Sequence, residues 1–247
     1  MGVGSPSRCA DDGGVVSVAR GTCGRRPPER WSTSVVKQER ALRTRNALLT
    51  AAGEVFSREG YRAASLTVIS GNVGVSSGAL HFHFPTKLDL AAAVEEAAAA
   101  RLRSIVEHCE RHEGPGGSVQ LVIDASYQVV ERLAQDPVLR AGFELGETME
   151  RAGGTGKVCD LWQRWVVSLL RHAQEAGGLR PDVVPDHLAS VVVAMTAGLA
   201  ALGRRDAHWP SRATLTSFWL LMLPQVTAAE TPPTCVVHGH DSAAEEL

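Results

Sequence analysis

Cysteine is scarce in this 247-residue chain, and its placement excludes two common structural devices. The five cysteines are scattered, odd in number and never form a CxxC pair, so we expect neither a disulfide framework nor a zinc knuckle. Cys109 and His112 lie three residues apart, but without a second pair they do not predict a metal site. We therefore expect no metal, no cofactor and a reducing, cytoplasmic location.

Long apolar runs are also missing. The longest one, residues 191–203, is shorter than the roughly 20 residues that a membrane-spanning helix needs. The apolar stretch nearest the N-terminus, residues 15–19, is too short for a signal peptide. No segment alternates apolar and polar residues as a β-strand does. The sequence therefore predicts an all-α protein with no membrane partner.

What the chain does have is a series of helical segments separated by glycine and proline. Apolar residues recur at helical spacing in a first helix that ends near Gly60. Later helices are expected at 88–108, 118–135, 137–151, 158–176, 185–203 and 210–226. The polar segments 1–35 and 228–247 lack any apolar period, and we expect both to be disordered.

The most informative spacing lies in residues 64–90. Ser65 is a natural N-cap, Gly74 is suited to break the helix in a left-handed turn, and Ser76 caps a second helix. Two helices of about seven residues around a three-residue turn form the unit that places a recognition helix in the major groove. Because other helical corners share this spacing, the spacing alone leaves an ordinary corner open.

A longer helix is predicted directly after this pair. Pro85 ends the second helix, and Thr86 forms a capping box with Asp89 three residues later. Charge also changes at this point of the sequence. Residues 37–88 carry a net charge of +4, whereas residues 89–247 carry −8. A basic N-terminal part joined to an acidic remainder suits a protein that presents one end to phosphates.

Several segments together carry a family resemblance. They are KQERALRTR at 37–45, AAGEVFSREGY at 51–61, GVSSGALHFHF at 74–84 and Lys87, with weaker similarity in LWQRWVVSLL at 161–170 and FWLLMLP at 218–224. The chain resembles the TetR family of transcriptional regulators, and within it the γ-butyrolactone autoregulator receptors of filamentous actinobacteria and their pseudo-receptor relatives. The resemblance implies an N-terminal three-helix helix-turn-helix domain at 36–84. It also implies a larger helical domain for ligand binding and dimerisation at 85–227.

The resemblance further implies which residues face double-stranded DNA. Short side chains early in the recognition helix let its N-terminus approach the bases and phosphates closely. The sequence departs from the family at Val68, where an acidic capping partner is usual, and at Ser77, where many members carry Lys or Arg. The predicted DNA-contacting residues are Arg43, Arg45, Ser65, Ser76, Ser77, Gly78, His81, Phe82 and Lys87.

The larger domain supplies candidates for a ligand site and a dimer interface. Trp162 and Trp165 lie three residues apart, with Val166 extending the same helical face. By resemblance, Trp162 corresponds to the tryptophan that closes over the lactone in the receptor group, and core packing is the alternative for both tryptophans. The last two helices are apolar on more than one side, which predicts a homodimer with Leu199 and Trp219 in the interface.

We therefore expect a dimeric repressor on a palindromic operator. A small-molecule effector, either a γ-butyrolactone or an antibiotic-like pathway intermediate, is expected to release it and so to control secondary metabolism. The alternative is a DNA-binding regulator without an effector.

An enzyme is not favoured by the remaining motifs. AGGTGKV at 152–158 lacks the first glycine and the Ser or Thr of a phosphate-binding loop. Glu144, Glu147 and Glu150 recur at helical spacing, and we interpret them as a solvated acidic face.

Overall fold

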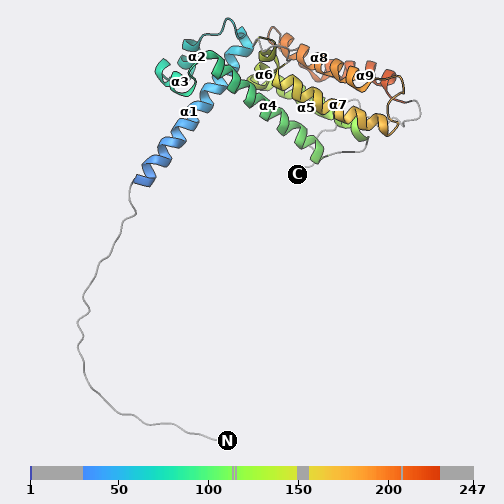
Figure 1. The fold of residues 1–247 in the computed structure, drawn as a ribbon, viewed down its shortest axis with the longest axis horizontal. Coiled ribbons are helices and arrows are strands. Elements are labelled where there is room, and N and C mark those ends of the chain that lie inside the picture. The colour runs from blue at the N-terminus through green and yellow to red at the C-terminus, as the bar shows by residue number, and fades with distance from the viewer. Residues whose placement is uncertain (2–29, 113, 115, 149–155, 207, 229–247) are drawn as a thin grey trace, which may run out of the picture. The chain divides into compact units, whose positions relative to one another are not determined.

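Nine helices and no strand occur in the part of the chain that the computed structural model describes, residues 1, 30–112, 114, 116–148, 156–206 and 208–228 (Figure 1). The predicted all-α class is confirmed, and one isolated antiparallel bridge joins Leu179 and Thr227. The helices are α1 (Arg30–Glu59), α2 (Leu66–Val73), α3 (Ser77–His83), α4 (Lys87–Arg111), α5 (Gly117–Gln135), α6 (Pro137–Thr148), α7 (Lys157–Glu175), α8 (Pro185–Gly203) and α9 (Arg212–Val226).

The observed helix bounds follow the predicted ones closely from α2 onward. The main difference is at the start, where α1 begins at Arg30, inside the segment predicted to be disordered. Residues 30–36 contain neither proline nor glycine, so nothing in them stops the helix from extending toward the N-terminus. Residues 2–29 and 229–247, the rest of the segments predicted to be disordered, lie outside the described residues. Residues 1–40 and 41–247 form separate units, and the packing described below belongs to the second.

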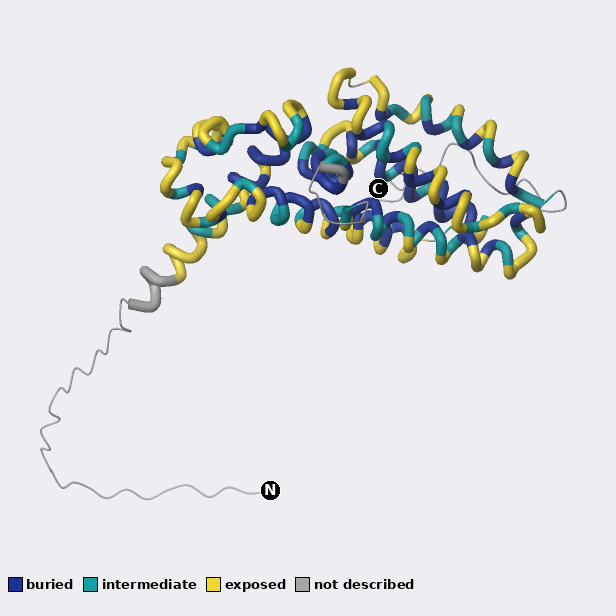
Figure 2. Tube along the Cα trace, turned by 45° about the horizontal axis from the view of Figure 1, so that its top comes forward, coloured by how far each residue is buried: buried dark blue, intermediate teal, exposed yellow. Residues whose placement is uncertain are grey.

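Helix α4 runs from the helix-turn-helix along one side of the larger domain (Figure 1). It packs most extensively against α6 and also contacts α5 and α7, while α8 packs against α7. The buried residues occupy the sides of the helices that face one another, and exposed residues follow the outer sides (Figure 2). The core is therefore a helical bundle in which α4 packs against three other helices.

Small residues let the backbones of α4 and α6 approach each other closely. Ala91 and Ala98 of α4 are fully buried, and Gly142 of α6 faces Ala98. A Cβ atom added at Gly142 would lie 2.2 Å from the Ala98 Cβ and 3.0 Å from a methyl group of Val158. Real Cβ contacts are essentially never that short, so the close packing of this helix pair requires glycine at position 142.

Helix α8 carries apolar residues on its outer side as well as on its buried side. By length and composition alone it is long and apolar enough to cross a membrane. In the structure, 39% of its most apolar window is buried. Leu188, Val192 and Leu199 are buried within the bundle, whereas Val191 and Leu202 are exposed. The exposed apolar side suits a protein partner.

Gly142→Ala tests the close packing of α4 against α6. The added methyl overpacks the contact with Ala98, so the free energy of unfolding is expected to fall by about 1–3 kcal/mol. Urea unfolding followed by circular dichroism measures this change.

Gly71→Ala in α2 is the matched control, because a Cβ there meets nothing within 4 Å. Alanine is the better helix former, so this variant is expected to gain up to about 1 kcal/mol. Equal effects of the two substitutions would contradict the packing argument.

Candidate functional site

Helices α2 and α3 form the predicted helix-turn-helix, and their caps are local. Gly74 adopts a left-handed conformation with φ 71° and ends α2, and its N–H donates to the Gly71 carbonyl at 3.0 Å. Ser76 begins α3, and its side-chain oxygen accepts a hydrogen bond from the Ala79 N–H at 3.2 Å. Ser65 occupies the N-cap position of α2, but its side chain makes no capping bond. The three-residue turn predicted from the sequence is confirmed.

The outward side of α3 carries four of the predicted DNA-contacting residues. Ser77, Gly78, His81 and Phe82 are all exposed, and Phe82 is 82% exposed. The residues that fix the helix from beneath are Leu80 and Phe84, which are buried. The Pro85 carbonyl accepts a hydrogen bond from His81 Nδ1 at 3.0 Å, which holds the imidazole at the end of the helix. The Phe82 ring contacts the neighbouring His83 ring edge-on, with centroids 5.3 Å apart, and most of its surface remains open to solvent.

The predicted phosphate-contacting cations lie against the core of the helix-turn-helix. Lys87 Nζ donates to the Arg62 carbonyl at 3.1 Å and lies 4.8 Å from the centre of the Tyr61 ring. The Arg45 guanidinium lies 5.1 Å from the centre of the Phe84 ring. Both cations therefore pack against aromatic rings, which limits their conformational freedom. Arg43 is exposed on α1.

A capping box joins the helix-turn-helix to α4, as predicted. The Asp89 N–H donates to Thr86 Oγ1 at 3.1 Å, and the Thr86 N–H donates to Asp89 Oδ2 at 3.0 Å. Only Phe84 and Pro85 separate this box from the last residue of α3. The orientation of the recognition helix is therefore coupled closely to the first turn of α4.

The predicted ligand residues lie on the inner face of α7. Trp162 and Val166 are fully buried, and the Trp162 Nε1–H donates to Thr196 Oγ1 of α8 at 3.3 Å. Trp165 is half-buried and stacks on Trp162 with ring centroids 5.3 Å apart. The Trp165 Nε1–H donates to Glu110 Oε1 of α4 at 2.7 Å. The tryptophan pair therefore connects α7 to both α4 and α8.

Buried polar groups nearby had no clear signal in the sequence. Glu95 of α4 is 1% exposed and accepts a hydrogen bond from the Lys157 N–H at 2.8 Å, so it caps the start of α7.

Burial raises the pKa of the Cys109 thiol to about 11, and the charge of Asp124 adds to the shift. Cys109 is therefore an apolar core residue, and the described residues contain no group of three metal-ligating side chains.

Glu144 corrects the expectation of a solvated acidic face. Its side chain is 15% exposed and forms an ion pair at 3.8 Å with Arg204, the residue that directly follows α8. The side chain of Glu147 and all of Glu150 lie outside the described residues.

The residues predicted for the dimer interface are buried inside the protomer. Leu199 is 4% exposed and Trp219 is 1% exposed, so neither offers contact area to a partner. A helix that is apolar on more than one side has both inward and outward apolar residues, and these two side chains pack inward. The exposed apolar residues of the same two helices are Val191, Leu202, Leu220 and Leu221.

Comparison with known proteins places the helix-turn-helix in a known family. The family described as bacterial regulatory proteins, tetR family, matches residues 48–94. The chain is 28% identical to the A-factor receptor protein of Streptomyces griseus over 196 residues, which cover 78% of this chain and 67% of that protein. It is 30% identical to the transcriptional regulator CymR of Pseudomonas putida over 143 residues, covering 53% of this chain and 68% of CymR.

A solved structure is similar over most of the chain. It is the TetR family protein CprB of Streptomyces coelicolor in complex with its biological operator sequence. The two share 27% sequence identity with a TM-score of 0.65, and the match covers 77% of this chain and 91% of CprB.

Ser76→Ala and Ser77→Ala separate the cap of α3 from its exposed surface. Loss of the bond from the Ala79 N–H in Ser76→Ala is expected to lower the free energy of unfolding by about 1 kcal/mol. Ser77→Ala removes an exposed hydroxyl and is expected to change that free energy by less than about 0.5 kcal/mol. Chemical unfolding of both full-length variants gives the comparison, and a larger loss for Ser77→Ala is the contrary result.

Proposed function

The chain belongs to the TetR family of bacterial regulatory proteins, and we propose that it is a repressor that binds a palindromic operator as a homodimer and leaves it when a small molecule binds. The observation that carries this proposal is the exposed surface of α3, formed by Ser77, Gly78, His81 and Phe82. Leu80 and Phe84, buried beneath this surface, and the capping box at the start of α4 hold it in one orientation. Pre-set orientation is what sequence recognition in a major groove needs.

In this proposal the DNA contacts divide by chemistry. Ser77, Gly78, His81 and Phe82 face base edges and the adjacent backbone, because they form the outward side of α3. Phosphates are held by the cations and hydroxyls that flank this helix, which fix the register without reading sequence. These flanking residues are Arg43, Arg45, Ser65, Ser76 and Lys87.

The proposed effector site is formed by Trp162, Trp165 and Val166 on the inner face of α7. The proposed signal is a γ-butyrolactone or an antibiotic-like pathway intermediate, in a regulator of secondary metabolism in the cytoplasm. Support comes from the resemblance to the receptor group and from the likeness to the A-factor receptor protein. A ligand here acts on α4 through the Trp165–Glu110 hydrogen bond, and α4 carries the helix-turn-helix at its other end.

For the dimer we propose an interface on the outer sides of α8 and α9. Val191, Leu202, Leu220 and Leu221 supply its apolar contacts, and the buried Leu199 and Trp219 support them from beneath. The proposed domains remain 36–84 for DNA binding and 85–227 for ligand binding and dimerisation.

Gly78→Ala tests the DNA-binding role of α3. A Cβ at Gly78 meets only Ser76 Oγ, at 3.9 Å, so the variant is expected to fold normally. The methyl group keeps the helix from approaching DNA closely, and we expect operator affinity to fall at least tenfold. A gel-shift titration on the DNA upstream of the chain's own gene measures this, with a scrambled duplex as the reference.

Gly71→Ala on α2 is the matched control and is expected to bind as the unmodified chain does. Equal binding to the upstream and scrambled duplexes would overturn the proposed function. If the complex forms but no extract of a late culture releases it, the alternative of a regulator without an effector replaces the effector part of the proposal.

Trp162→Phe tests the proposed effector site. A synthetic acyl-γ-butyrolactone is expected to quench the intrinsic fluorescence of the unmodified chain and to leave that of Trp162→Phe unchanged. Trp209→Phe, at an exposed loop position, is the matched control and should keep the quenching. Quenching that persists in Trp162→Phe but disappears in Trp209→Phe would place the ligand elsewhere.

A further inference from the structure

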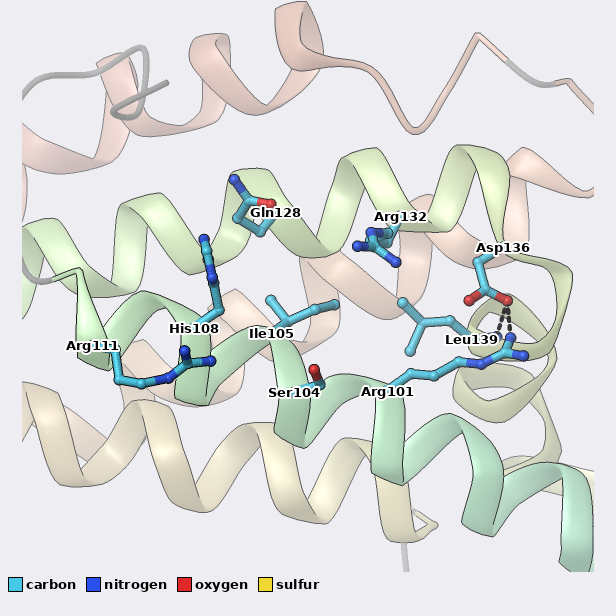
Figure 3. Close-up of a pocket in the computed structure, with 9 residues that line it drawn as sticks. All are labelled: Arg101, Ser104, Ile105, His108, Arg111, Gln128, Arg132, Asp136 and Leu139. Atoms are coloured by element: carbon cyan, nitrogen blue, oxygen red, sulfur yellow. Dashed lines mark hydrogen bonds and ion pairs between the residues drawn. The ribbon is translucent and has the colours of Figure 1, made fainter. Parts of the chain in front are cut away.

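A cavity lies between α4 and α5, on a different side of α4 from Glu110, which contacts the tryptophan pair. Its volume is about 360 Å³, which lies in the range of small-molecule sites. Figure 3 shows side chains from α4 and α5 converging on it. The lining residues are Arg101, Ser104, Ile105, His108, Arg111, Gln128, Arg132, Asp136 and Leu139.

The cavity combines an apolar floor with a cationic rim. Ile105 and Leu139 are buried and form the floor. Three arginines and a histidine stand around it, against a single carboxylate, that of Asp136. Such a composition is the reverse of the acidic average of residues 89–247.

The one carboxylate is already engaged. Asp136 Oδ1 accepts hydrogen bonds from the Val138 N–H at 3.0 Å and from the Leu139 N–H at 3.2 Å, so it caps α6. Asp136 also forms an ion pair with Arg101, which closes one end of the cavity (Figure 3). Its charge is therefore balanced by Arg101 and by the N-terminus of α6.

The charges of the other two lining arginines, Arg111 and Arg132, are not balanced by a carboxylate among the described residues. Among the described residues, no carboxylate forms an ion pair with Arg111 or Arg132. In the described part of the chain, Arg111 donates to the Glu107 carbonyl at 3.1 Å, within its own helix. On α5, Glu131 is adjacent in sequence to Arg132 but pairs with Arg212 of α9 instead. The carboxylate next to Arg132 in sequence is thus engaged by α9 and does not balance the charge of Arg132.

We propose that this cavity binds a small organic anion, a carboxylate or phosphate ester with an apolar body. Arg132 of α5 holds the charged group from one side, with His108 and Arg111 of α4 on the other. The apolar body lies over Ile105 and Leu139. Guanidinium groups suit this task because their planar donors match carboxylate and phosphate oxygens. The site is separate from the α7 residues proposed for the effector, so it does not depend on that assignment.

Titration calorimetry on the full chain without DNA tests the site. The probes are phenyl phosphate and benzoate at fixed ionic strength, with benzyl alcohol as the neutral analogue. We expect saturable binding of one anion per chain, and the stronger of the two anions identifies the preferred group. Arg132→Gln is expected to weaken that binding at least tenfold, since it removes a charge-assisted hydrogen bond.

Arg103→Gln is the matched control, because Arg103 is an exposed arginine of α4 that pairs with Glu96 outside the cavity. Its affinity for the anion is expected to stay within twofold of the unmodified chain. Arg132 is exposed, so Arg132→Gln is expected to fold, and Arg111→Gln provides a second variant with a smaller expected loss. Unchanged affinity in Arg132→Gln, equal loss in Arg103→Gln, absence of saturable binding, or binding of benzyl alcohol as tight as that of the anions would each overturn the proposal.

Discussion

The close packing of α4 against α6 is the constraint on which the rest of the structure depends. Gly142 leaves no room for a side chain against Ala98, so the two helices meet at a fixed distance. At its N-terminal end, α4 starts in a capping box only two residues after the recognition helix. At its C-terminal end, Glu110 accepts a hydrogen bond from Trp165 of α7. One helix therefore connects the proposed DNA surface, the core and the proposed effector residues.

This arrangement gives the proposed repressor a short physical route between its two ends. A ligand that shifts Trp165 acts on α4 directly, and α4 cannot move without changing its contact with α6 or the position of α3. Well-packed interfaces of this kind favour discrete arrangements over continuous deformation. The cationic cavity lies along the same helix, so an anion bound there contacts the same connecting element.

Local signals made most of the fold predictable from the sequence. The turn at Gly74, the cap at Ser76 and the capping box at Thr86 each depend on residues within a few positions, and all three are present. Non-local packing was the part that could not be predicted. The Glu95 cap of α7 joins residues 62 positions apart, and the inward packing of Trp219 depends on neighbours from other helices. Composition alone likewise gave no indication that Arg132 would face a cavity while Glu131 turned away.

Hydrogen–deuterium exchange of the full chain, with and without its operator duplex, tests the central claim most directly. That claim is that residues 65–84 contact DNA and that α4 carries the effect onward. The account predicts that slowed exchange on adding operator is concentrated in residues 65–84 and in the first turns of α4. Protection confined to α8 and α9, or no change in residues 65–84 at saturating operator, would contradict it.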